Sequence, residues 1–207
     1  HSQVLPTLAM YGYGYDRDWG VGLGRDFSDG SWGVSITTGA GMPLRLGKSY
    51  LFSGRLSFGV LARDNWSVGL SGAYGEALET MGYTIMSSDP KAFRLAGVDI
   101  TRVWNNLENR LEAAVGRKFG LNAWTVFWRL GINLLGEERL KWEIQPIFMR
   151  EGGKNGLKLG TGLSFVATGD LTLRMMYAYD REERDSRVVF QVYYYKRIIF
   201  YRDRRMR

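Results

Sequence analysis

Few side chains in this 207-residue sequence can carry out acid–base or nucleophilic chemistry. The one histidine is His1, and there is no cysteine. Without an internal imidazole or a thiolate, nucleophile–base pairs and the usual nitrogen and sulfur ligands of metal ions are largely excluded. The carboxylates Asp99, Glu112 and Glu143 fall on one face of the strands expected below, but no spacing singles out a general acid–base pair. The sequence therefore predicts no catalytic residues, no metal site and no cofactor.

Two glycine-rich stretches match phosphate-binding loops only in part. In GMPLRLGKS at 41–49, five residues separate Gly41 from Gly47, whereas the phosphate loop has four residues before its Gly-Lys-Ser. A strand, not a helix, is expected to follow it, so we predict a turn. GVGLG at 20–24 also lacks the helix that a dinucleotide site requires.

Basic residues give a stronger indication. The alternation described below places the following on the face opposite the large apolar side chains: Arg55, Arg63, Lys118, Arg129, Lys141, Lys158 and Arg174. The acidic residues against them are Asp99, Glu112, Glu143 and Asp180. Two interpretations stay open. Either the surplus of positive charge lines a lumen that attracts anions, as rings of Arg or Lys do, or these charges are paired and fill a small closed barrel.

The placement of these charged side chains on one face depends on β-strands. In AMYGYGYDRDWGVGLGRDF at 9–27, aromatic and aliphatic residues alternate with glycine, as in Tyr11-Gly12-Tyr13-Gly14-Tyr15. A period of two is typical of an extended strand, whose successive side chains point to opposite faces. Glycine weakens a strand unless its face needs the room. We therefore predict two strands joined at 16–18, with a large apolar face and a thin face.

The alternation continues along the chain and predicts an all-β fold of about twelve strands in a single domain over 1–207. After the first two strands, the expected ranges are 32–41, 50–63, 66–74, 92–104, 109–119, 123–134, 139–150, 156–167, 170–180 and 187–200. An even number of strands predicts that short and long connections alternate between the two ends. The longest expected connections, 76–91 and 181–187, fall at the same end.

Two places conflict with this pattern. Pro146 lies inside an expected strand although proline cannot donate to a sheet, so we expect a bulge or a local break there. The segment 104–119 also has a helical spacing, with Trp104, Leu107, Leu111 and Val115 recurring every three or four residues. A tight turn followed by a strand is the preferred prediction, and a helix is the alternative.

The two faces indicate how the sheet is arranged. In a soluble barrel the large apolar residues point inward and polar residues point outward. Here the second face is glycine, serine, threonine and scattered charges, which suits a lumen better than a solvent-facing coat. A bilayer requires every backbone donor and acceptor to be paired, so a sheet within it must close. We therefore expect a closed, antiparallel, up-and-down transmembrane β-barrel.

In this pattern the whole chain resembles bacterial outer-membrane β-barrels. It is similar in size to the small twelve-stranded porins for acidic oligosaccharides and to barrels associated with exopolysaccharide export. The resemblance implies an outer-membrane location, contact with the lipid bilayer and lipopolysaccharide, and an aromatic assembly signal that Phe200 and Tyr201 could supply. The basic tail at 201–207 departs from that ending, and it could bind an acidic periplasmic partner or headgroups.

Four functions follow as expectations. The first is a channel that passes anionic small solutes or saccharides through a basic lumen. The second is a non-catalytic component of exopolysaccharide export or envelope assembly with a plugged lumen. The third is an outer-membrane enzyme that uses carboxylates and serine. The fourth is a soluble basic β-protein that binds nucleic acid, which the net charge of +7 permits. The first is preferred, with no nucleic-acid partner.

Overall fold

The computed structural model of this protein describes residues 18–136 and 139–195 and is almost entirely β-structure. No helix in the described part is long and apolar enough to cross a bilayer. The elements, in chain order, are β1 (Gly20–Phe27), β2 (Gly30–Thr37), β3 (Tyr50–Phe58), α1 (Leu61–Asp64), β4 (Trp66–Ala77), β5 (Thr80–Met81), β6 (Thr84–Ile85), β7 (Lys91–Trp104), β8 (Leu107–Lys118), β9 (Leu121–Asn133), β10 (Leu140–Glu151), β11 (Lys154–Thr168), β12 (Leu171–Asp180) and β13 (Asp185–Tyr194).

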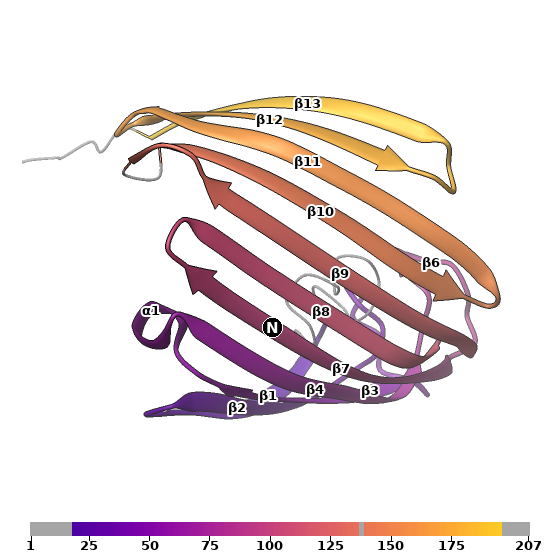
Figure 1. Ribbon diagram of the computed structural model, residues 1–207. Helices are drawn as coiled ribbons and strands as arrows, with labels where there is room; N and C mark the ends of the chain where they lie inside the picture. Colours follow the sequence, from indigo (N-terminus) through magenta and orange to yellow (C-terminus); the bar gives the residue numbers. More distant parts are fainter. Residues whose placement is uncertain (1–17, 137–138, 196–207) are drawn as a thin grey trace, which may run out of the picture.

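Eleven strands form one antiparallel, up-and-down sheet in the order β1-β2-β3-β4-β7-β8-β9-β10-β11-β12-β13 (Figure 1). The remaining two, β5 and β6, form a small hairpin between β4 and β7. The eleven strands correspond to the last eleven of the twelve that the sequence predicts. The expected first strand, the aromatic signal at Phe200 and Tyr201 and the tail at 201–207 all lie outside the described residues.

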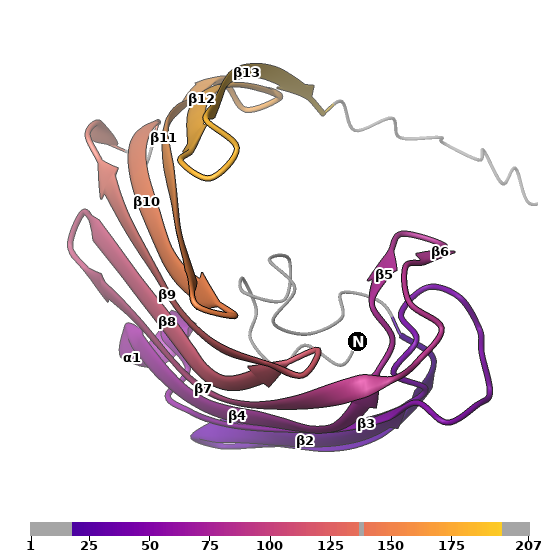
Figure 2. The same cartoon turned by 90° about the vertical axis from the view of Figure 1, so that its right-hand side faces the viewer.

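The sheet curves strongly, so that seen from one end it encloses a space on its concave side (Figure 2). Among the described residues no pairing joins β1 to β13, so the described sheet is open between these two strands. We call the two ends of the sheet the α1 end and the hairpin end, after α1 and the β5–β6 hairpin, which lie at opposite ends of the strands in Figure 1.

Cross-strand register divides the side chains into two faces. The outer face is exposed and apolar on all eleven strands of the sheet, with Val21, Leu70 and Val115 exposed by 73%, 54% and 61%. Its other exposed members are Leu23, Phe27, Trp32, Val34, Ile36, Tyr50, Phe52, Leu56, Phe58, Trp66, Tyr74, Ile100, Trp104, Leu111, Trp124, Trp128, Phe148, Leu163, Met175, Tyr177, Val188, Phe190, Val192 and Tyr194. The predicted apolar face is therefore present, and no other layer of the described residues packs against it.

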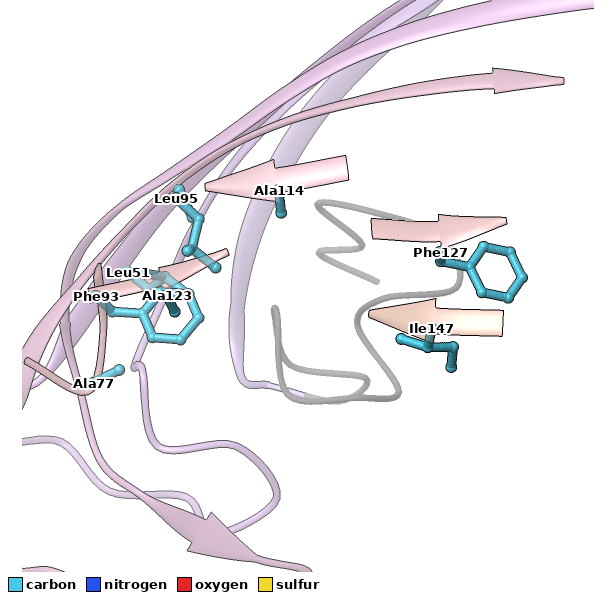
Figure 3. Close-up of a cluster of buried hydrophobic side chains, with 9 residues drawn as sticks. Leu51, Ala77, Phe93, Leu95, Ala114, Ala123, Phe127 and Ile147 are labelled. Atoms are coloured by element: carbon cyan, nitrogen blue, oxygen red, sulfur yellow. The ribbon is translucent and has the colours of Figure 1, made fainter. Parts of the chain in front are cut away.

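The inner face holds an apolar cluster that the sequence analysis did not anticipate. Phe93, Phe127 and Leu51 are at most 1% exposed, and Figure 3 shows several of the cluster's side chains. The cluster consists of Leu51, Ala73, Ala77, Phe93, Leu95, Ala114, Ala123, Phe127 and Ile147. Phe93 also packs edge-on against Phe119, with ring centroids 5.4 Å apart. The inner face thus carries an apolar cluster toward the hairpin end in addition to its charged residues.

The two ambiguous segments are both resolved as strand. The segment 104–119 forms the end of β7, a turn and β8, so the helical alternative is wrong. Asn105 adopts a left-handed φ of 51° in this turn, a conformation that asparagine tolerates better than most residues. Pro146 lies within a continuous β10 and faces Leu159 of β11, while the pairing with β9 is interrupted at Gln145 and Pro146. The expected local break is therefore present on the β9 side.

Two predicted boundaries are wrong. The strand expected over 50–63 ends at Phe58, because Gly59 at φ 79° and Asn65 at φ 59° turn the chain and α1 forms between them. The connection expected over 181–187 spans only 181–184, because Asp185 already pairs with Asp180. The second long connection is 38–49, which lies at the hairpin end together with 78–90.

Candidate functional site

Charged side chains on the inner face form a continuous chain of ion pairs. Glu108 of β8 accepts from Arg129 of β9 and, at 2.6 Å, from Lys141 of β10. Lys141 also lies 3.3 Å from Glu143, whose other oxygen lies 3.3 Å from Arg174 of β12. We call Arg129, Glu108, Lys141, Glu143 and Arg174 the charge chain. It links four strands, and three of the predicted cations belong to it.

A second group of charges continues the pattern toward β3. Arg55 makes a bidentate contact with Asp99 of β7, with nitrogen–oxygen distances of 2.5 and 2.8 Å. Asp99 stands directly opposite Glu112 on β8, and Glu112 is fully buried with its carboxylate 2.7 Å from Arg110. Each carboxylate of this like-charged pair therefore has its own guanidinium, which offsets the cost of burying it.

The two predicted cations near the hairpin end are also paired. Lys118 lies 2.8 Å from Glu151 of β10, and Lys158 lies 2.7 Å from Asp180 of β12. All six predicted cations within the strands are thus within ion-pair distance of a carboxylate on the inner face. This geometry favours the second of the two interpretations that the sequence left open, in which paired charges occupy the interior.

Arg63 differs from the other predicted cations because it does not belong to a strand. It lies in α1, half exposed, and contacts Asp29 at 2.9 Å and Asp64 at 2.8 Å. Its hydrogen bonds to Asp64, together with one from the backbone of Val60, lower the pKa of the Asp64 carboxyl to about 2. Arg63 therefore closes the turn at the α1 end, and it contributes no charge to the inner face of a strand.

Glycines opposite the charged residues provide the space for them. A Cβ atom added to Gly69 would lie 2.4 Å from both Arg55 and Asp99. One added to Gly131 would lie 2.7 Å from the Lys141 side chain. These glycines are on the thin face that the alternation predicts, and their role is to accept long charged side chains from neighbouring strands.

Glycine and serine line the part of the inner face formed by β1 to β3. Hydroxyl groups there bond across strands, with Ser31 to Ser57 at 2.8 Å and Ser35 to Ser53 at 2.6 Å. A groove of about 540 Å³ runs along this wall, lined by residues that include Gly22, Gly24, Ser31, Ser35, Ser53 and Arg55. The wall offers hydroxyls and backbone to a hydrated solute, with Arg55 at one side.

This arrangement can bind and orient polar groups, but it brings together no recognisable set of reacting groups. Within the described residues no cluster of carboxylates or histidines is arranged to hold a metal ion. The predicted acids Asp99, Glu112 and Glu143 each have a guanidinium or ammonium within ion-pair distance. The alternation alone did not identify Glu108, Arg110 and Glu151 as partners. Glu108 falls just before the strand predicted over 109–119, although its alternation with Glu112 places it on the inner face.

Comparison with family models and with curated proteins gives no match. No family model matches the chain, and no curated protein matches it. Any function proposed for it therefore has to come from the geometry described above and from the pattern of its sequence.

The position of Glu108 between two cations predicts that its removal is costly. Glu108→Gln leaves Arg129 and Lys141 with one carboxylate partner fewer at a site where all three side chains are at most 26% exposed. We expect the free energy of unfolding, measured by urea titration in detergent micelles, to fall by about 1 to 3 kcal/mol. Glu183→Gln, in the exposed turn after β12, is the control and should change it by less than about 0.5 kcal/mol. Equal values for the two variants would contradict a supporting role for the charge chain.

Because Gly69 lies against the Arg55–Asp99 pair, a larger side chain should destabilise the protein more on the inner face of this strand than on its outer face. Gly69→Ala should displace this pair and destabilise the protein by about 1 to 3 kcal/mol in the same titration. Gly72→Ala changes the same strand on its outer face, where the nearest atom to the added Cβ lies 3.6 Å away. We expect its effect to stay below about 0.5 kcal/mol. A larger loss for Gly72→Ala than for Gly69→Ala would show that the assignment of faces is wrong.

Proposed function

We propose that this chain is a transmembrane β-barrel of the bacterial outer membrane that passes small polar solutes, anionic solutes and saccharides among them. The observation that carries the proposal is the exposed apolar outer face, which extends over all eleven strands of the sheet. Soluble monomers rarely expose contiguous apolar patches larger than a few hundred Å². A face of this extent fits hydrocarbon better than water.

The dimensions of the strands support a bilayer environment. From β4 through β13 the strands of the main sheet have 10 to 15 residues, and a tilted strand needs about 9 to 11 to cross a bilayer. On the outer face, Trp66 and Trp104 lie at the α1 end, and Tyr74 and Trp124 lie near the hairpin end. Aromatic residues at both ends of an aliphatic band are typical of the two interfacial girdles of such barrels.

Closure of the sheet is part of the proposal. In hydrocarbon, the free edges of β1 and β13 would leave backbone groups unpaired, and each such group costs several kcal/mol. The strand predicted over 9–15 stays a prediction. Added to the eleven described strands, it completes the count of twelve, an even number as is usual for bacterial outer-membrane barrels.

The inner face supports passage of polar solutes with only a weak preference for anions. The glycine and serine wall of β1 to β3 leaves a groove, while the cations of the remaining strands are held in ion pairs. Paired charges produce a much weaker field than a ring of free arginines. We therefore propose a channel that admits hydrated saccharides by size and hydrogen bonding, with Arg55 beside the groove. The proposed channel carries out no chemistry.

A second function is favoured by the buried apolar cluster. Phe93, Phe127 and Ile147 are on the inner face yet at most 2% exposed, so protein atoms fill the space against them. A barrel whose interior is filled at this level would act as a non-catalytic component of exopolysaccharide export or envelope assembly. Its partners would be anionic saccharides or periplasmic export proteins, in addition to the lipid.

Planar-bilayer conductance distinguishes the two functions. For the channel we expect a stable single-step conductance and a reversal potential in a salt gradient that indicates weak anion preference. Glu108→Gln should increase that preference, because it releases Arg129 and Lys141 from a shared partner. Substituting Arg55, Arg129 and Arg174 by glutamine should reduce it. Purified protein that inserts without conducting would support the plugged alternative, and conductance with unchanged selectivity in all variants would remove these residues from the pore.

A charged residue introduced halfway along a strand on the outer face tests whether the protein inserts into a bilayer. Leu70 lies near the middle of β4 and is 54% exposed. Leu70→Arg should destabilise the folded state in lipid vesicles by about 2 to 4 kcal/mol, as measured by urea titration. Leu46→Arg is the control, because Leu46 lies in the connection 38–49 and is 87% exposed. If Leu70→Arg behaves like this control, the outer face does not contact hydrocarbon.

A further inference from the structure

Three arginines interrupt the apolar outer face near the hairpin end. Arg94 of β7, Arg117 of β8 and Arg150 of β10 share this face with the exposed aromatic and aliphatic residues, and all three are exposed. We call them the arginine row. Each lies in the last few residues of its strand at the hairpin end. Arg94 and Arg117 pair directly, and Arg150 lies one outer-face position nearer mid-height, because it pairs with Trp124 while Arg117 pairs with Asn122.

The register places two of these positive charges side by side, which is energetically unfavourable without a negative charge nearby. Arg94 stands directly opposite Arg117 on the neighbouring strand, and like charges in this position destabilise a sheet. Within residues 18–136 and 139–195, none of the three arginines forms an ion pair. Glu76 lies on the same face but stands opposite Ala92, and the Arg94 guanidinium instead lies 4.9 Å from the centre of the Tyr74 ring. The adjacent positive charges thus have no carboxylate between them.

The outer face around the row has both apolar and polar neighbours. Toward mid-height from Arg117 lie Val115, which is 61% exposed, and Trp124, which is 40% exposed; Arg150 is directly opposite Trp124. Polar Asn122 stands opposite Arg117, and Asn155 stands opposite Arg150. A ligand that fits this surface has an anionic group beside the arginines and an apolar part that extends toward mid-height.

We infer that the Arg94–Arg117 pair of the arginine row binds the phosphate of a membrane lipid whose acyl chains cover Val115 and Trp124. The inference rests on the proposed function, since it needs the outer face to lie in a bilayer. Neighbouring strands are about 4.8 Å apart, so Arg94 and Arg117 can both reach one phosphate. Guanidinium–phosphate hydrogen bonds are charge-assisted and often bidentate, and a bridging phosphate turns the repulsion between the two arginines into shared attraction.

The opposite end of the same strand provides a matched control. Arg102 is exposed on the outer face of β7 at the α1 end, but it stands opposite Asn109 and Trp66. It has the same charge, strand and face as Arg94 without a second arginine across from it. If lipid binding depends on the paired arginines, the Arg102→Gln variant should therefore bind the lipid as the wild type does.

The test compares binding of phosphatidic acid and phosphatidylcholine to the purified full chain in detergent, measured by native mass spectrometry. The wild type and Arg102→Gln should prefer phosphatidic acid, and the double variant Arg94→Gln/Arg117→Gln should bind it about tenfold more weakly. Its binding of phosphatidylcholine should not change. Because the double variant removes a like-charged pair, we expect it to fold, which urea titration checks.

Equal affinity of the wild type for the two lipids would overturn the inference, as would an equal loss in Arg102→Gln. Displacement of phosphatidic acid by the same concentration of inorganic phosphate would also overturn it, because the row would then bind a free anion. Insertion into phosphatidylcholine vesicles, followed by flotation, separates this outcome from failure of the barrel. A wild type that inserts without lipid preference refutes only the lipid site, whereas a wild type that does not insert refutes both proposals.

Discussion

The pairing of each strand with its neighbours in a single curved sheet is the constraint on which the other features depend. Side chains alternate between faces, so one register decides which residues meet on each side, and a slip of one residue would exchange the faces. The register places exposed leucine, valine and tryptophan on the outer face and nearly all the ion pairs of the strands on the inner face. Both the proposed membrane location and the proposed lumen follow from this separation.

Charges on the inner face are accommodated by matching each long side chain to a small one and to an opposite charge. Gly69 leaves room for Arg55 and Asp99, and Gly131 leaves room for Lys141. A buried charge without a partner is strongly destabilising, whereas a shared carboxylate such as Glu108 satisfies two cations at once. The interior therefore gains rigidity from its charges while it loses most of the field that unpaired arginines would produce.

The sequence alone predicts the strands, but it does not predict which charged residues form ion pairs with each other. Alternation predicts eleven strands correctly, because a period of two survives in every segment, even where Trp104 and Leu107 also suggest a helix. It does not predict that Arg63 leaves the strand, since this depends on left-handed Gly59 and Asn65. Nor does it identify Glu108 as the common partner of two cations, because that contact depends on the register between strands. The buried cluster around Phe93 was missed for the same reason.

The distribution of charge between the two faces relates the proposals to each other. Strand cations on the inner face, such as Lys141 and Lys158, lie beside carboxylates, whereas Arg94, Arg117 and Arg150 on the outer face form no ion pair among the described residues. In the proposed barrel, part of the net charge of +7 is thus directed at the lipid headgroups instead of the solute. Anionic lipid lowers the energy of the outer arginines by Coulomb attraction, and an interior whose charges are mostly paired lets hydrated saccharides move without being held by free charges. The alternation that separates apolar from polar residues thus also separates two sets of charges. The arginines of the outer face contact lipid headgroups, and the ion pairs of the inner face line the interior.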